Sequence, residues 1–258
     1  MGNPGRPGAK SPDVRKRVLR GRRRLSRGEG SHSWGMAGTL ALTPEQEAAV
    51  RAALDKLPLR DKALAELLLG SGYRVTEALS LTVADVWASG RVKARVVVQR
   101  AHMKGGRSPW KRSVTARSVP LNARVVAALE SYLFSRFGSA GPADRLEPLF
   151  PSRSGGGRLS RWRVNQIVHQ LLEAAGIDAR SGTGLYGTHS LRKTFCVNIY
   201  HRSFNDITLT RAAMAHVSVQ TTQAYLPISA EEVDRIVMAL GVEVPPRAAV
   251  RGENRSEA

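Results

Sequence analysis

Apolar residues recur at helical spacing along most of the chain between residues 43 and 240. The run Thr43-Pro-Glu-Gln46 predicts a helix start, because Thr caps well, Pro suits the first helical position and Gln46 can close a capping box. This helix should reach about Lys56. A second helix is expected from about Arg60 to Gly70, with a buried leucine-rich stripe. By the same signals, further helices are expected at about 75–80, 122–137, 160–175, 189–200, 206–215, 219–225 and 229–240.

The period changes between residues 85 and 121. Residues 92–98 are short and β-branched, residues 113–119 alternate, and turn signals stand at Ser89-Gly90 and Gly105-Gly106. Such segments predict antiparallel strands joined by tight turns. We therefore expect a mainly α fold with a small three-stranded antiparallel sheet (α+β), with Pro120 ending the sheet.

The periodic part of the chain defines the expected domain. Residues 1–40 are rich in Gly, Pro, Ser and Arg without apolar periodicity, so a disordered basic arm is expected there. Residues 41–242 should form one folded domain, and residues 243–258 a flexible tail. A merely solubilising tail or an uncertain start codon is the alternative interpretation of the arm.

The charge of the chain indicates a polyanionic partner. The net charge is +19 at pH 7 and the sequence pI is about 11.2. The first 33 residues carry ten Lys and Arg against two acidic residues, and the rest of the chain keeps more than half of the surplus. Nucleic acid and an acidic membrane surface both fit such a charge.

The sequence offers no sign of membrane insertion or export. No apolar run approaches the roughly 20 residues that a membrane span needs, and the basic N-terminus lacks the apolar stretch of a secretory signal. A soluble protein of the cytoplasm, associated with the nucleoid, is expected. Cys196 is the only cysteine, so it cannot form an internal disulfide; its apolar surroundings predict a small buried residue.

Two histidines, an arginine and a tyrosine near the C-terminus form the chemical motif. His189 and Arg192 are three residues apart on a predicted helix, so both can donate to one anion. Farther on, His216 and Tyr225 end the pattern H-x-S-x-x-T-T-x-x-Y. A phenol becomes a nucleophile only when it loses its proton or meets a strongly polarised partner. A phosphate held by cations would be such a partner.

An upstream box completes the pattern. Gly72-Tyr-Arg-Val-Thr-Glu-Ala-Leu-Ser-Leu81 reads G-x-R-x-x-E-x-x-x-L and precedes the other two boxes. Three boxes in this order resemble the tyrosine recombinase (phage integrase) family, over roughly residues 43–240. The resemblance implies the catalytic-domain fold of that family. Family members usually carry a helical core-binding domain ahead of this one, where the basic arm stands here. In the family the two domains together clamp the DNA duplex. The chain is therefore expected either to be a minimal recombinase or to need a partner that closes the clamp.

The resemblance also implies a role for each site residue. Arg74 and Arg192 would neutralise the scissile phosphate, His189 would exchange a proton with Tyr225, and His216 would donate to a phosphate oxygen. A hairpin lysine would protonate the leaving oxygen. Lys104 is the preferred candidate, and Lys111 is a rival because residues 107–112 lengthen the hairpin.

Three further expectations concern the surroundings of the site. Glu77 should anchor the helix that carries Arg74. Ala215 stands where the family usually has glycine, which adds a methyl group at a tight turn. No Cys/His/Asp/Glu spacing suggests a metal site, and neither a metal nor another cofactor is expected.

The expected function is that of a site-specific recombinase or integrase of a mobile element. It would cut and rejoin double-stranded DNA through a 3′-phosphotyrosyl link to Tyr225. The alternatives are a type IB topoisomerase-like activity and a DNA-binding regulator without full recombination. A homo-tetramer on DNA, with accessory proteins, is the expected assembly. In it the helix at 229–240 would dock on a neighbouring protomer, unless it packs on its own domain.

Overall fold

The computed structural model describes residues 2, 39–108, 110, 114–138, 146–153, 157–178, 186–216, 218–226, 234, 237 and 238. The chain divides into two units, Met1–Ala37 and Gly38–Ala258. Only Gly2 of the first unit is described, so all that follows concerns the second. The expected basic arm, the C-terminal tail and nearly all of the expected helix at 229–240 therefore lie outside the described residues.

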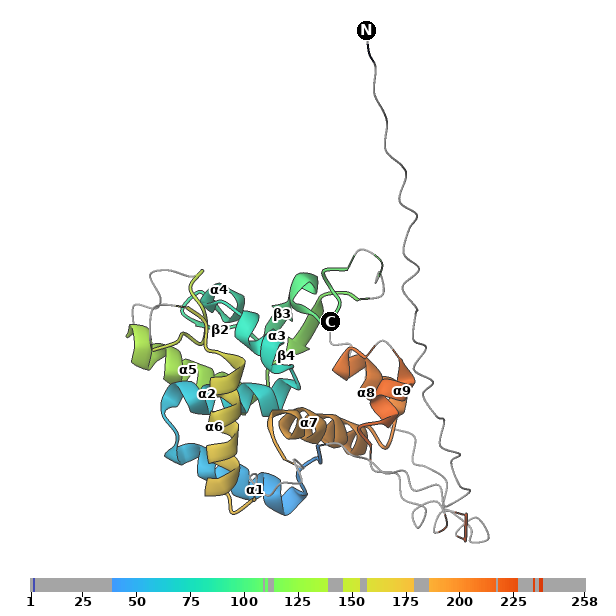
Figure 1. Ribbon diagram of the computed structural model, residues 1–258. Helices are drawn as coiled ribbons and strands as arrows, with labels where there is room; N and C mark the ends of the chain where they lie inside the picture. Colours follow the sequence, from blue (N-terminus) through green and yellow to red (C-terminus); the bar gives the residue numbers. More distant parts are fainter. Residues whose placement is uncertain are drawn as a thin grey trace, which may run out of the picture. The chain divides into compact units, whose positions relative to one another are not determined.

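The second unit consists mainly of helices (Figure 1). The helices in chain order are α1 (Pro44–Ala53), the 3-10 turn η1 (Leu54–Lys56), α2 (Leu59–Ser71), α3 (Val75–Ser80), α4 (Val83–Val86), the 3-10 turn η2 (Arg100–His102), α5 (Ala123–Phe137), α6 (Arg161–Ala174), α7 (Thr188–Arg202), α8 (Ile207–Met214) and α9 (Val219–Gln223). Thr43 forms the predicted capping box, and Asn122 and Ser160 cap α5 and α6.

Helix α2 forms the centre of the core. It packs against α5 and α7 and is buried around almost its whole circumference, so the predicted leucine stripe is only part of its contact surface. The helix ends at Gly72, whose φ of 59° lies in the left-handed region. A Cβ atom at Gly72 would stand 2.3 Å from Cδ1 of Phe195 on α7. Glycine is thus required here by conformation and by space.

The strands form two separate antiparallel pairs. β1 (Trp87–Ala88) pairs with β2 (Arg91–Val92), and β3 (Arg95–Val98) pairs with β4 (Arg117–Pro120). The predicted three-stranded sheet is thus replaced by two ladders within the described residues. The run from 92 to 98 is interrupted at Lys93, whose backbone N–H donates to Val86 O at 2.7 Å and whose Nζ donates to Ala84 O at 2.6 Å. The predicted class, mainly α with a small antiparallel sheet component, is confirmed.

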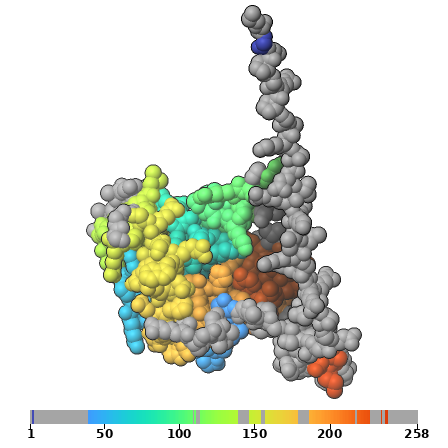
Figure 2. Space-filling view, in the orientation of Figure 1, coloured from blue at the N-terminus to red at the C-terminus, as the bar shows by residue number. Residues whose placement is uncertain are grey.

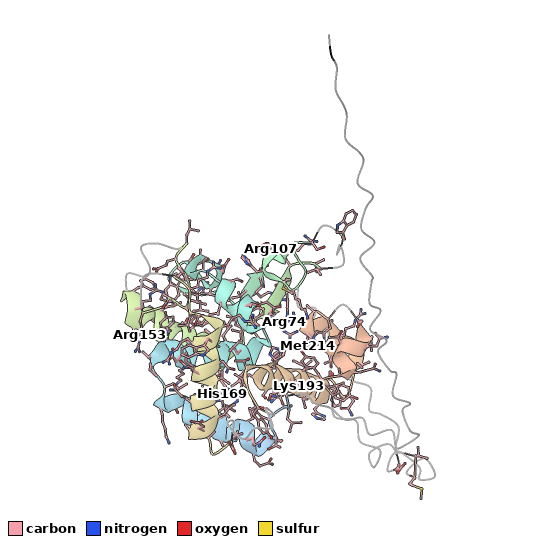
Figure 3. The ribbon with its side chains drawn as sticks, in the orientation of Figure 1. Arg74, Arg107, Arg153, His169, Lys193 and Met214 are labelled. Atoms are coloured by element: carbon pink, nitrogen blue, oxygen red, sulfur yellow. The ribbon has the colours of Figure 1, made fainter. Side chains whose placement is uncertain are left out.

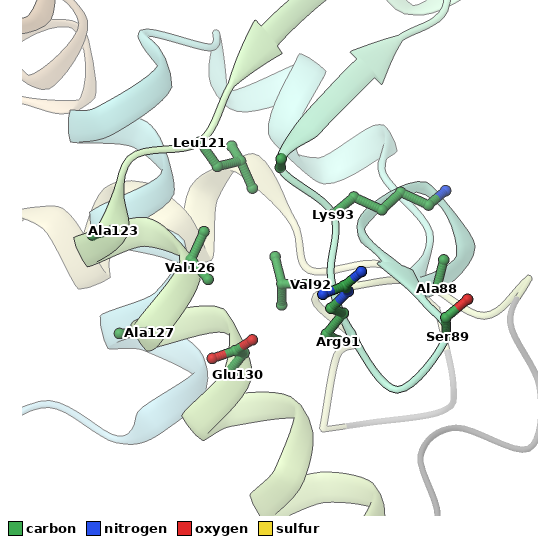
Figure 4. Close-up of a pocket in the computed structure, with 11 residues that line it drawn as sticks. Ala88, Ser89, Arg91, Val92, Lys93, Leu121, Ala123, Val126, Ala127 and Glu130 are labelled. Carbon is green, nitrogen blue, oxygen red and sulfur yellow. The ribbon is translucent and has the colours of Figure 1, made fainter. Parts of the chain in front are cut away.

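A shallow hollow of about 760 Å³ lies between the β1–β2 hairpin and α5 (Figure 4). Val92, Leu121 and Val126 line it, with Arg91 and Glu130 nearby. None of the site residues predicted from the sequence borders it. Among the helices described, none combines the length and the apolar character needed to cross a membrane.

Candidate active site

The first arginine box folds into a sharp corner between α2 and α3. The backbone N–H of Arg74 donates to Glu77 Oε2 at 2.8 Å, which caps the start of α3. The guanidinium of Arg74 donates to the other oxygen, Glu77 Oε1, at 2.7 Å. Glu77 is fully buried, whereas a quarter of the Arg74 side chain remains exposed. Glu77 thus anchors Arg74 as predicted and leaves its guanidinium at the surface of the site.

Arg192 is held almost wholly inside the protein at 2% exposure. Its Nη1 donates to Gly72 O, and its Nη2 donates to Met214 O at 3.3 Å. The same guanidinium lies 3.8 Å from Glu77 Oε2. Because the carbonyls come from the ends of α2 and α8, Arg192 connects the first box to the segment that carries His216. The Nε–H of Arg192 is a buried donor without a hydrogen-bond partner among the described residues.

His216 lies between Arg192 and the helix that precedes the tyrosine. Its Nε2 is 3.0 Å from Nη2 of Arg192, and its Nδ1 is 3.0 Å from Thr222 Oγ1. Since a guanidinium can only donate, Nε2 accepts and the proton resides on Nδ1, which donates to Thr222. Burial, followed by the charges of Arg192, Arg74 and Arg117, lowers the pKa of His216 to about 3. His216 is therefore neutral at physiological pH.

Tyr225 follows α9 by two residues and is partly buried. Its ring centroid is 5.2 Å from that of His216, and Lys193 Nζ lies 5.6 Å from the same ring. Burial, followed by the charge of Arg74, lowers the pKa of Arg192, and Glu77 and Tyr225 oppose this lowering. Arg192, His216 and Tyr225 are thus brought together, as the motif predicted.

His189 and Lys104 lie on a groove beside this cluster, together with Arg74. The groove has a volume of about 1080 Å³ and runs between the loop after η2, α3, and the start of α6 and α7. In Figure 2, α3 is teal, the loop after η2 green, α6 yellow and α7 orange, and Figure 3 labels Arg74 and Arg107, which both line the groove. His189 and Lys104 are exposed. Although much of the His189 side chain is exposed, partial desolvation of its ring, followed by the charges of Arg192 and Arg74, lowers its pKa. The rival Lys111 lies outside the described residues.

Comparison with known proteins decides the family. Residues 41–232 match the family described as "Phage integrase family". The chain belongs to the phage integrase family. It is 34% identical over 178 residues to tyrosine recombinase XerD of Mycobacterium leprae, a match that covers 68% of this chain and 50% of the relative. It is 33% identical over 202 residues to tyrosine recombinase XerC of Neisseria meningitidis, covering 77% and 56%. The chain thus spans about half the length of these curated relatives.

Solved structures show the same fold. The XerA recombinase superposes with a TM-score of 0.58 at 22% identity, over 85% of this chain and 68% of that one. The post-cleavage complex of the XerH recombinase with its palindromic difH substrate superposes with a TM-score of 0.58 at 20% identity, over 78% of this chain and 52% of that one. The Tn1549 transposon integrase in complex with transposon right end DNA gives 0.54 at 21%, over 79% and 66%. The predicted family and its catalytic-domain fold are thereby confirmed.

Several residues of this phage integrase site were not singled out from the sequence. Thr222 Oγ1 accepts from Nδ1 of His216 in the tautomer that Arg192 imposes, and Lys193 Nζ lies 5.6 Å from the centre of the Tyr225 ring. Arg117, the first residue of β4, is 3% exposed and lies beneath the arginine pair. The sequence does contain a signal for Arg117. It stands two residues before the buried Val119, and because side chains two apart in a strand point to the same face, Arg117 is expected on the inward face of β4. Among the described residues, no group of three His, Cys, Asp or Glu side chains could hold a metal ion.

Proposed function

We propose that the chain carries the catalytic domain of a site-specific DNA recombinase that cuts and rejoins duplex DNA through a covalent link to Tyr225. The observation that carries this proposal is the contact of Arg192, His216 and Tyr225 beside a groove that also contains Arg74. A phosphodiester resists attack because its oxygens repel a nucleophile, so its charge must be neutralised in the transition state.

The charges of the site suit this task. One carboxylate, Glu77, faces the guanidiniums of Arg74, Arg192 and Arg117 at 2.7, 3.8 and 3.7 Å. One negative charge cannot neutralise three positive ones, so the pocket retains positive charge for a phosphate. The planar guanidinium of Arg74, partly exposed, can bind two non-bridging oxygens. Arg192, whose Nη2 lies beside His216, provides the second guanidinium.

The reaction then follows from the residues at hand. The oxygen of Tyr225 attacks phosphorus, the bond to the 5′-oxygen breaks, and a 3′-phosphotyrosyl link and a free 5′-hydroxyl result. The phenol proton passes to His189, which lies exposed in the groove with a lowered pKa. Lys104 protonates the leaving 5′-oxygen. Because the link conserves bond energy, a 5′-hydroxyl from another strand can reverse the step without a nucleotide cofactor.

His216 acts differently in the structure described here from the way the family resemblance implies. Its Nε2 accepts from Arg192 and so offers no proton to a phosphate. Donation to a phosphate oxygen would require the Arg192–His216 contact to open and the proton to move to Nε2. We propose that phosphate binding brings this about, since the phosphate competes for the same guanidinium.

The assembly and setting belong to the same proposal. The DNA partner is double-stranded, the active form is a homo-tetramer on DNA aided by accessory proteins, and the reaction takes place in the cytoplasm at the nucleoid. The recombined DNA belongs to a mobile element. The sequences that flank the gene provide a check on this last point, because an integrated element is bounded by repeats of its attachment site.

Covalent capture tests the reaction without knowledge of the target. Nicked genomic DNA from the source organism would be incubated with the protein, denatured, and recovered by means of the attached protein. We expect sequences enriched at one site with the wild type and none with Tyr225→Phe. Tyr200→Phe, a partly buried tyrosine in the same small cluster, is the matched control and should capture like the wild type.

Each alternative predicts a different result. Capture spread over many unrelated sequences, with relaxation of supercoiled plasmid, would indicate a topoisomerase. Capture that persists in Tyr225→Phe, or its absence from the wild type, would contradict the proposed nucleophile. The recovered site, placed twice on one plasmid, should then support strand exchange.

A further inference from the structure

Arg117 lies beneath the catalytic cluster without reaching its surface. Its Nη1 donates to Gly72 O at 3.1 Å, and its Nη2 donates to Ser71 O at 2.7 Å and Ala213 O at 2.8 Å. The guanidinium also lies 5.0 Å from the centre of the Tyr73 ring. Both of its terminal nitrogens are thus occupied by backbone carbonyls, and only 3% of the side chain is exposed. A buried charge is costly unless it is paired and hydrogen-bonded, so this arrangement calls for an explanation.

The partners of Arg117 are those of Arg192. Both guanidiniums donate to Gly72 O, both lie within 4 Å of Glu77 Oε2, and they bind the adjacent carbonyls of Ala213 and Met214. Arg117 thus ties β4, the end of α2 and the end of α8 to one another. These are the backbone segments that hold Arg192 in place and lead to His216.

The two cations also influence each other directly. Burial, followed by the charge of Arg192, lowers the pKa of Arg117 to about 10, so Arg117 remains protonated at neutral pH. Because Arg117 also pairs with Glu77, the carboxylate neutralises Arg192 less completely than it would if Arg192 were its partner alone. Arg192 therefore keeps more of its charge for a phosphate.

We propose that Arg117 is a positioning residue, which holds Arg192 for the scissile phosphate through the carbonyl of Gly72 and the carboxylate of Glu77 that the two arginines share. This role rests on the proposed function. It differs from the roles of the six site residues, because Arg117 would act on Arg192 through their shared backbone and carboxylate partners and not on the phosphate itself. A guanidinium is required, since three carbonyls in different directions need its fixed fork of donors.

The test compares Arg117→Met and Arg117→Lys with Arg95→Met. Arg95 is the matched control because it is exposed on β3, the strand paired with β4, and donates only to Ser118 Oγ among the described residues. Single-turnover cleavage and DNA affinity would be measured on the captured site. Two substrates with this site would be compared. One carries the natural phosphodiester, and the other carries a neutral methylphosphonate at the scissile position, where no phosphate charge needs neutralising.

We expect Arg117→Met to bind DNA within about threefold of the wild type but to cleave the phosphodiester about 10²-fold more slowly, the loss typical of a displaced catalytic group. Arg117→Lys, which keeps the charge without the fork, should lose about tenfold and remain folded even if Arg117→Met does not. Both deficits should shrink several-fold on the methylphosphonate. Arg95→Met should match the wild type on both substrates.

Several results would overturn this role. Wild-type cleavage by Arg117→Lys would show that the fork is not needed. An equal deficit on the charged and neutral substrates would indicate general damage to the fold. Rescue by a 5′-bridging sulfur, whose departure needs no proton, would place the effect on Lys104 instead. If the wild type itself forms no covalent product, the proposed function fails, and this role fails with it.

Discussion

Replacing Gly72 by alanine should show how tightly the corner of the site is built. Two costs add at this position. Placing an L-residue at φ of 59° costs about 1 kcal/mol, the low end of the penalty for the left-handed region, and the new Cβ would lie 2.3 Å from Phe195 Cδ1. Overpacking of this kind costs roughly 1–3 kcal/mol. We therefore expect Gly72→Ala to lower the free energy of unfolding by about 2–4 kcal/mol.

Gly90→Ala is the matched control. Gly90 has φ of 78°, yet a Cβ there would meet nothing within 4 Å. This variant should lose only the conformational part, about 1 kcal/mol. In a domain of this size 1 kcal/mol corresponds to about 2–4 °C in Tm, so thermal melts should separate the two variants by roughly 2–12 °C.

A second background isolates the clash. In Phe195→Ala the Cγ, Cδ1 and Cε1 atoms that the new Cβ would meet are absent, so adding Gly72→Ala should cost only about 1 kcal/mol, as at Gly90. Equal Tm losses for Gly72→Ala and Gly90→Ala in the wild-type background would refute the reasoning, since the contact with Phe195 would then carry no cost.

Three other predictions concern charge and chemistry. His216 has a pKa of about 3 in the folded protein against about 6.5 in the unfolded chain, so its contribution to stability is complete above pH 6.5 and is lost as the pH falls toward 3. The free energy of unfolding, measured in urea between pH 6.5 and 4.5, should therefore fall more steeply for the wild type than for His216→Gln. Parallel curves would contradict the lowered pKa. A 5′-bridging sulfur substrate should restore single-turnover cleavage by Lys104→Ala but not by Arg74→Ala, and rescue of Lys111→Ala instead would reassign the general acid. Removal of residues 1–38 should reduce the slope of log affinity against log salt concentration by about 0.9 per lost phosphate contact, equally on cognate and random DNA. A loss of affinity confined to the cognate site would show that this segment contacts bases.

Local signals in the sequence predicted much of the fold, because they act over a few residues. The caps at Thr43, Asn122 and Ser160 depend on neighbours three residues away, and all are present. The division of the strand run depends on Lys93 folding back on α4, which β-propensity alone does not encode. Propensity therefore predicted strands without their pairing.

The same distinction holds for the site. The motif spacing identified Arg192, His216 and Tyr225, and the structure brings them together. Arg117 was not identified, because its partners at Ser71 and Ala213 are 46 and 96 residues away in the chain. Contacts of such sequence separation form only when the whole fold is assembled. The tautomer of His216 was equally beyond reach, since it depends on what both ring nitrogens contact.

The hydrogen bonds from Arg192 to His216 and from His216 to Thr222 have a consequence for the energetics of binding. Thr222 belongs to α9, the helix just before Tyr225. If a phosphate takes the guanidinium from His216, it also changes the hydrogen bonds that hold α9. Anion affinity and the mobility of Tyr225, the proposed nucleophile, then depend on the same equilibrium, and linkage makes their coupling reciprocal. A substitution that loosens α9 should therefore tighten anion binding, by at most the factor with which an anion loosens α9.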